Sequence, residues 1–328
     1  MLLTPTSISL MITLAFSMLL SVSSNSWFLA WLGLEMNLMV FTPLILKNYN
    51  KYSSESTVKY FLTQTFASML IMMAIAPLLS LGLVKTILII LVSLLLKMGA
   101  APTHSWVPAV SSGVSWPYLL VLLTTQKVAP LFLASYTMNM PLTSSTMYMY
   151  IIASASLGSI GGLSQTALRK MLAFSSIAHL AWMLFTLILS SNLTIIYFIF
   201  YFIISLTLVY PIHVNQLSTI NQILMDKSRL LKLNVIASTM SLSGLPPFTG
   251  FAPKMLVLMV STNNTVIVLI LVWSSVTSMF FYLRVILLST YQSPSTMNTS
   301  MTSSYSMNPV LINLLGLPLT PILTNYAN

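Results

Sequence analysis

The sequence predicts an all-α membrane protein that crosses the bilayer about eleven times. Of its 328 residues, 57% are hydrophobic and 5% are charged, against roughly 25% charged in soluble domains. Apolar stretches near the ~20 residues that a helix needs to cross ~30 Å of hydrocarbon recur along the chain. These stretches are continuous rather than alternating, which favours helices over the strands of a closed barrel, the other structure that satisfies its backbone in lipid.

The predicted spans leave no room for a sizeable soluble domain. The first span begins close to Met1 without a basic leader, so we expect no cleavable signal or transit peptide. The uncharged stretch 290–308 is rich in Ser and Thr and predicts a linker outside the membrane. The spans cover roughly residues 2–22, 26–46, 56–80, 83–101, 115–137, 146–163, 168–190, 193–216, 233–261, 264–289 and 308–324.

Two of these spans, the fourth and the ninth, contain residues that interrupt a helix. The fourth reaches Gly99 and Pro102, and the ninth is cut at Gly244-Leu-Pro-Pro247. If residues 1–137 and 146–289 form two five-helix units, with 290–328 as a linker and a final helix, each interruption falls on the fourth helix of its unit. Because five is odd, the units would have opposite orientations, the inverted repeat found in many ion transporters.

Charge and cysteine content limit the possible functions. The chain has no cysteine, which excludes disulfides, a thiolate-held iron–sulfur cluster and a thiol nucleophile within it. Its excess of 13 Lys and Arg over 3 Asp and Glu needs no nucleic-acid partner, because loops on one side hold eight basic residues and the opposite loops hold only Lys85. This asymmetry places the N-terminus on the cytoplasm-like side and the C-terminus across the membrane. The eight are Lys47, Lys51, Lys59, Arg169, Lys170, Lys227, Arg229 and Lys232.

Three lysines lie deep in apolar sequence: Lys97, Lys127 and Lys254. A lysine near the bilayer centre costs about 2.5–3.5 kcal/mol on insertion scales, so three of them call for a function. Lys97 and Lys254 adjoin the interruptions, where freed backbone carbonyls and water replace lipid. A lysine in such a partly wet cavity can accept and donate protons. The alternative is that the lysines extend along the helices to the headgroups.

Three further titratable residues are candidates for the same chemistry. Glu35 lies midway along the second span, and an opposite charge beside a buried lysine would let the pair hold or release a proton. A static ion pair joining two helices is the alternative. His179, in the seventh span, titrates near neutral pH in its ordinary state and could relay protons or simply bond a neighbouring helix. His104, after the first interruption, is a weaker candidate because it also fits a solvated loop.

Motifs for other chemistries are absent from the sequence. There is no GxxxxGK[ST] loop, no GxGxxG after a strand, no HExxH and no cluster of carboxylates suited to a metal. We therefore expect no nucleotide, metal or flavin site in this chain.

Six ordered motifs resemble those of a known family. AWLGLEMN, KYFLTQTFAS, LLLKMGAAPTHSWVP, TTQKVAP, LRKMLAFSSIAHLAWM and SLSGLPPFTGFAPK resemble the chain 2 family of mitochondrial NADH–ubiquinone oxidoreductase, respiratory complex I. The resemblance covers about residues 27–260. Thr125 stands where Trp is common in the family and Ala181 where Gly is common, and neither difference removes an ionisable group. Eleven spans resemble the shortened animal form of this antiporter-related family.

The resemblance implies a proton-pumping membrane subunit driven by redox chemistry elsewhere in the complex. Glu35, Lys97, Lys127, Lys254 and His179 match the family's ionisable positions. It also implies a hetero-oligomer with other membrane-arm subunits and phospholipids, with NADH, flavin, iron–sulfur clusters and ubiquinone bound elsewhere. The location would be the mitochondrial inner membrane, with the N-terminus in the matrix and the C-terminus in the intermembrane space. A structural spacer subunit and a stand-alone cation/proton antiporter remain alternatives.

Overall fold

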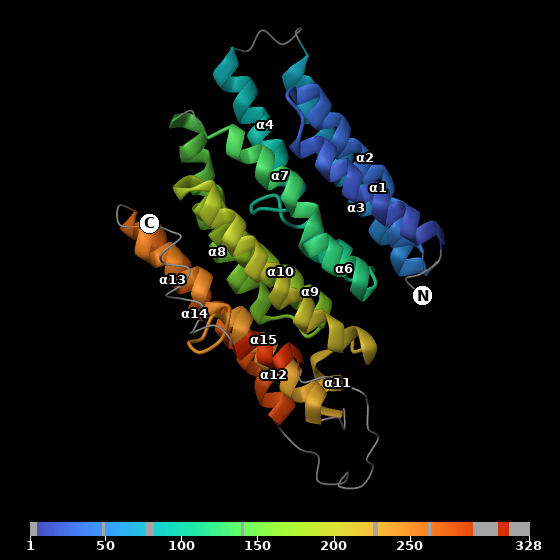
Figure 1. Cartoon of the computed structure of the whole chain (residues 1–328), viewed down its shortest axis with the longest axis vertical. Coiled ribbons are helices and arrows are strands. Elements are labelled where there is room, and N and C mark those ends of the chain that lie inside the picture. Colours follow the sequence, from blue (N-terminus) through green and yellow to red (C-terminus); the bar gives the residue numbers. More distant parts are fainter. Residues whose placement is uncertain are drawn as a thin grey trace. The chain divides into compact units, whose positions relative to one another are not determined.

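The structure is a computed structural model that describes residues 5–47, 50–76, 82–138, 141–225, 229–261, 264–290 and 308–314. Most of the predicted linker at 290–308 and most of the predicted eleventh span lie outside these residues, as does Lys227. The chain divides into two compact units, residues 1–150 and 151–328. Each unit is a bundle of helices (Figure 1).

The described residues of the first unit form seven helices and the start of an eighth. Within it, α1 packs on α2, α2 on α3 and α3 on α4, while α7 contacts both α1 and α4. A short turn joins α1 to α2, and Ser26 caps α2, its hydroxyl accepting from the Leu29 amide at 3.4 Å. The helices are α1 (Pro5–Val22), α2 (Trp27–Leu46), α3 (Lys51–Ile75), α4 (Leu83–Met98), α5 (Trp106–Ser111), α6 (Trp116–Leu123), α7 (Thr125–Tyr136) and α8 (Pro141–Leu163), which continues into the second unit.

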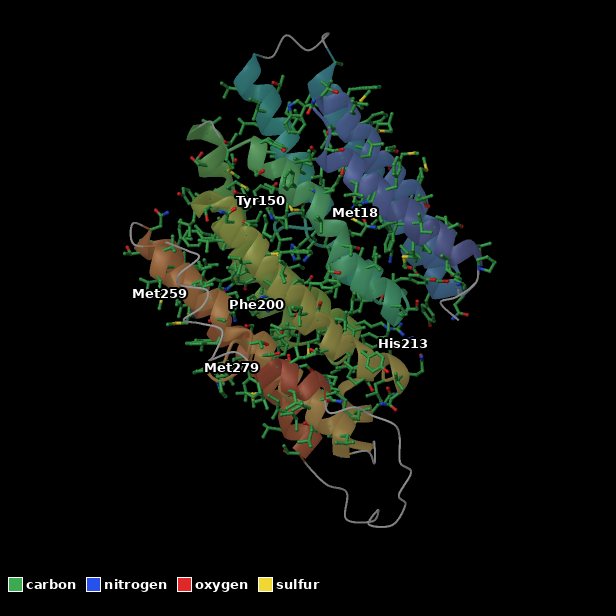
Figure 2. All side chains as sticks on the ribbon, in the orientation of Figure 1. Met18, Tyr150, Phe200, His213, Met259 and Met279 are labelled. Atoms are coloured by element: carbon green, nitrogen blue, oxygen red, sulfur yellow. The ribbon has the colours of Figure 1, made fainter. Side chains whose placement is uncertain are left out.

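The second unit is built around α9, which is almost entirely buried. There α9 contacts α10, α13 and α14, and α12 contacts α10, α14 and α15. Apolar side chains of the second unit also project outward (Figure 2), and Met259 on its surface is 56% exposed, as a lipid-facing surface requires. The helices are α9 (Leu168–Leu189), α10 (Ser191–Val214), α11 (Ile220–Met225), α12 (Arg229–Ser243), α13 (Phe251–Val260), α14 (Thr265–Thr290) and α15 (Asn308–Leu314).

The prediction of an all-α membrane protein is confirmed. Among the described residues, eight helical segments are long and apolar enough to cross a membrane, and no strand is present beyond an isolated bridge between Ala167 and Thr219. The helix of the fourth predicted span, α4, ends at Met98 rather than at residue 101. The first helix of the ninth predicted span, α12, ends at Ser243. The total of eleven spans, the inverted repeat and the division at 137, 146 and 290 stay predictions.

Candidate functional site

Both predicted helix interruptions are confirmed, and the first unit contains one of them. The first break, residues 99–105, separates α4 from α5. Gly99 adopts the left-handed conformation (φ +75°) that glycine tolerates best. The Gly99 and Ala100 amides then donate back to the carbonyls of Leu96 and Leu95, both at 3.0 Å. This pattern closes a helix end, and Lys97 lies in the final turn of α4.

Two side chains donate to carbonyl groups at the end of α4. Trp106 Nε1 donates to the Leu96 carbonyl at 3.1 Å. Gln64 Nε2, from α3, donates to the Lys97 carbonyl at 3.3 Å. Because an unpaired buried carbonyl costs about 1–3 kcal/mol, these contacts hold the open helix end in a fixed place, and with it the backbone that carries Lys97.

Lys97 and Lys127 line one cavity of the first unit. Lys97 is 6% exposed and Lys127 3% exposed, so both side chains lie inside the unit. The cavity has a volume of about 20 Å³, which suits about one water molecule. Its polar lining also includes Asn37, Tyr60, Gln64 and Gln126. Both lysines are therefore buried beside a small cavity with a partly polar lining.

A third interruption, which the sequence analysis missed, precedes Lys127. The fifth span is bent at Thr124, between α6 and α7. The hydroxyls of Thr124 and Thr125 donate to the carbonyls of Leu120 and Val121, at 2.6 and 3.0 Å, an arrangement that often bends helices. Pro130, inside α7, removes a further helical hydrogen bond. Lys127 therefore starts the second half of a bent helix.

An amide network crosses the same cavity. Gln126 Nε2 donates to Asn37 Oδ1 at 3.0 Å, which joins α7 to α2. The Tyr60 hydroxyl of α3 lies 3.5 Å from Gln126 Oε1. The sequence analysis did not select these residues, although each occurs in one of the six motifs. A sequence pattern could have identified them: a polar side chain within an apolar span, next to a titratable side chain, as Gln126 is next to Lys127.

Glu35 is close enough to Lys97 and Tyr60 to interact with both electrostatically. It makes no direct ion pair, since the described residues contain only the exposed pair of Glu55 and Lys59, at 2.6 Å. Its Oε2 atom is buried without a hydrogen-bond partner. Glu35 and Lys97 therefore influence each other's charge through space rather than through a contact.

The second break, residues 244–250, repeats the backbone arrangement of the first. Gly244 ends α12 with φ +81°. Its amide donates to the Ser241 carbonyl at 3.1 Å, and the Leu245 amide donates to the Met240 carbonyl at 3.4 Å. Lys254, on α13, reaches back to this end, and its Nζ donates to the Ser243 carbonyl at 2.8 Å.

Lys254 and His179 line a cavity of about 10 Å³ in the second unit. Lys254 is 8% exposed, and its Nζ lies 5.9 Å from the centre of the Trp182 ring, within range of a cation–π attraction. His179 Nδ1 lies 3.0 Å from the Tyr197 hydroxyl. The other lining residues are mainly small or hydroxylated: Ser175, Ala178, Ser274, Ser275, Ser278 and Tyr282. The site thus contains two titratable groups and several hydroxyls.

Two other ionisable residues, the candidate His104 and Arg284, lie apart from these cavities. His104 is partly exposed, and its Nδ1 lies 3.2 Å from the Pro102 carbonyl. Arg284 donates to the carbonyls of Leu163 and Gln165 at the end of α8. The described part of the chain contains no group of three His, Cys, Asp or Glu placed to hold a metal ion. Lys254 belongs to the second unit and is described separately from Glu35, Lys97 and Lys127, which belong to the first.

Comparison with known proteins identifies the family. Residues 24–281 match the family model described as NADH:quinone oxidoreductase/Mrp antiporter, TM. NADH-ubiquinone oxidoreductase chain 2 of Anopheles gambiae is 43% identical over 286 residues, 84% of this chain and 83% of that protein. The protein of the same name from Osphranter robustus is 36% identical over 330 residues, 93% of this chain and 94% of that protein.

Solved structures share the fold at lower identity. A chain of respiratory complex I from Thermus thermophilus, solved with bound aureothin, has a TM-score of 0.82 at 22% identity and covers 98% of this chain and 79% of its own. A chain of the Mrp complex from Dietzia sp. has a TM-score of 0.78 at 16% identity and covers 89% of this chain and 62% of its own. Together with the curated relatives, these matches show that the chain belongs to the NADH-ubiquinone oxidoreductase chain 2 family, the antiporter-like membrane subunits of respiratory complex I.

Proposed function

We propose that this chain, as an antiporter-like membrane subunit of complex I, carries protons across the mitochondrial inner membrane through its buried lysines. The observation that carries the proposal is the shared cavity of Lys97 and Lys127, two buried amines beside a helix break and a helix bend. An amine enclosed by protein but adjacent to polar groups can change its protonation state without moving far.

Coulomb coupling would make these lysines act in sequence. Two like charges in a low-dielectric interior repel far more strongly than in water, so protonation of Lys127 would favour release from Lys97. Glu35, which interacts with Lys97 through space, would oppose that release. The amide network of Asn37 and Gln126 would hold α2 and α7 in place while the charge changes.

The second cavity would supply the next station. Lys254 and His179 share it, and His179 contacts the Tyr197 hydroxyl, so a proton passing through His179 would have a neighbouring acceptor and donor. In this proposal His104, partly exposed beside the first break, exchanges protons with the aqueous surface.

Redox chemistry would take place in other subunits. NADH, flavin, iron–sulfur clusters and ubiquinone would be bound there, and this chain would couple to them only through the membrane arm. The loop charge asymmetry supports an N-terminus in the matrix and a C-terminus in the intermembrane space.

Replacing Lys127 with Met tests the proposal. The complex carrying Lys127→Met, reconstituted into vesicles, should oxidise NADH but pump fewer protons per electron. Loss of a proton-transfer group slows its step by about 10²- to 10⁴-fold, so flow through this chain should almost stop. Proton uptake read from a pH-sensitive dye, relative to NADH oxidation, measures the ratio. The control is Lys51→Met, since Lys51 is exposed at the start of α3. An unchanged ratio in Lys127→Met would contradict the proposal.

One observation favours a structural spacer instead. Lys254 is held by the Ser243 carbonyl and lies beside Trp182, as a locked amine would be. If the chain were a spacer, Lys254→Met would weaken assembly while the assembled fraction pumped normally. If it carries protons, the assembled fraction should pump less.

A further inference from the structure

The short helix α15 carries a buried polar residue that the proposed proton route does not use. Asn313 is 0% exposed, although an amide side chain buried without partners is costly. Its backbone carbonyl accepts from the Thr249 amide at 3.0 Å. Its side chain contacts Thr207 and Ser241. One residue thus binds α10, α12 and the second break.

The hydrogen-bond directions can be assigned from the hydroxyl geometry. Thr207 Oγ1 donates to the Ile204 carbonyl at 2.8 Å, so it accepts from Asn313 Nδ2, at 3.2 Å. Ser241 Oγ lies 3.3 Å from Asn313 Oδ1 and also 2.7 Å from the Ser238 carbonyl. The Ser241 hydroxyl has one proton, which the Ser238 carbonyl and Asn313 Oδ1 both compete for. The Asn313 amide therefore donates to α10 and lies within hydrogen-bond distance of a hydroxyl on α12.

These contacts lie where the backbone of the break has lost its helical partners. Thr249 precedes α13 and is 3% exposed, and its amide is satisfied by the Asn313 carbonyl rather than within a helix. Gly250 lies so close to Ser241 that a Cβ atom on it would be 1.7 Å from the Ser241 carbonyl oxygen. The break and the end of α12 are therefore in tight contact, and Asn313 bonds to both sides of that contact.

We propose that Asn313 is a positioning residue, which braces the second break from α15 and so fixes where α13 places Lys254 against the end of α12. The effect on pumping rests on the proposed proton function, whereas the brace itself does not. If α13 moves relative to α12, the Lys254 contact with the Ser243 carbonyl changes, and Asn313 opposes that movement. No other described helix bonds both to Ser241 and to Thr249.

Asn313→Leu tests the side-chain part of the brace, because it removes the contacts with Thr207 and Ser241 but keeps the backbone carbonyl that binds the Thr249 amide. The new side chain is of similar size. The readout is a thiol introduced as Thr249→Cys, which is informative because the chain has no cysteine of its own. Thr249 Oγ1 has no hydrogen-bond partner among the described residues, so this change removes no bond. In the assembled complex, reaction of Cys with a methanethiosulfonate reagent, read by mass spectrometry at this peptide, should be about tenfold faster with Asn313→Leu, the equivalent of one average buried hydrogen bond.

The matched control is Leu311→Ala, a change on the same helix at a side chain that is 59% exposed. It should leave the labelling rate unchanged. Thr207→Val, which removes only one contact, should raise the rate less than Asn313→Leu and add little to it, as residues in one network do. Equal labelling rates in Asn313→Leu and the unmodified complex would overturn the brace.

The link to pumping has a separate readout. Asn313→Leu should displace the pH profile of pumping by about one unit, and should have no further effect in a complex that already carries Lys254→Met. If Lys254→Met pumps normally while the labelling rate still rises, the proton function fails and the brace stands. If Lys254→Met stops pumping while Asn313→Leu changes neither labelling nor the pH profile, the brace fails and the proton function stands.

Discussion

The two helix breaks use the same backbone turn but place their lysines differently. In both, a left-handed glycine ends the first helix, and the next amides fold back onto its last carbonyls. Lys97 precedes its glycine, and the described residues include no hydrogen bond to its ammonium group. Lys254 follows its glycine by ten positions in sequence and donates to the Ser243 carbonyl. The first amine is thus available to water in a cavity, whereas the second is held by the chain.

In each unit the broken helix supplies backbone carbonyls, and the neighbouring side chains determine which donors bind them. In the first unit, Trp106 and Gln64 donate hydrogen bonds to the carbonyls of Leu96 and Lys97. The Lys97 side chain therefore does not bind these carbonyls and lines the cavity instead. In the second unit, the lysine itself takes the carbonyl of Ser243.

The largest effect is expected from alanine at the two glycines. A left-handed conformation costs an alanine about 1–2 kcal/mol. At Gly244 the added Cβ would meet the flexible end of Lys254 at 2.8 Å, whereas at Gly99 it would lie 2.2 Å from Val107 Cγ2 and add about 1–3 kcal/mol of overpacking. Thermal inactivation of the assembled complex should therefore show Gly99→Ala to be the more damaging change. Equal losses of thermal stability in the two variants would mean that the residues around Gly99 shift to accommodate the added methyl group without an extra cost.

A smaller effect should separate the two lysines. Lys254→Met leaves the buried Ser243 carbonyl without its donor and should destabilise the complex by about 1–3 kcal/mol. Lys97→Met leaves no carbonyl without its donor, because no hydrogen bond of the Lys97 ammonium group is among the described residues, and should destabilise the complex less than Lys254→Met does. Thermal inactivation measures stability, and proton pumping in both variants should fall. A stable Lys254→Met complex would show that the Ser243 contact is not needed.

The smallest effect is expected at Trp106. Trp106→Phe removes the Nε1 donor to Leu96, but the Leu96 carbonyl also accepts from the Gly99 amide. The loss should be about 0.5–1.5 kcal/mol, an average net hydrogen bond, again measured by thermal inactivation. Gln64→Leu serves as the comparison, since Gln64 holds the neighbouring Lys97 carbonyl. If Trp106→Phe lost more stability than Lys254→Met, the packing of the Trp106 ring, rather than its hydrogen bond, would be what supports the break.

Local residue chemistry predicted a good part of this site. Glycine and proline marked both breaks, since their backbone limits act whatever surrounds them. The sequence did not predict the bend at Thr124, because threonine bends a helix only when its hydroxyl donates to a carbonyl of the preceding turn. The sequence placed Glu35 among buried lysines without specifying a partner, and in the structure it interacts with Lys97 without direct contact, since side-chain distances depend on how α2 and α4 pack.

By itself, the sequence determined that the chain is a bundle of membrane helices with lysines beside two helix breaks, because apolar length and backbone restrictions are local properties. Only the tertiary structure decided which groups meet. It placed Lys97 with Lys127, joined Gln126 to Asn37 across 89 positions of sequence, and brought Asn313 to the second break. Such contacts depend on the packing of separate helices, and no local pattern specifies which faces come together.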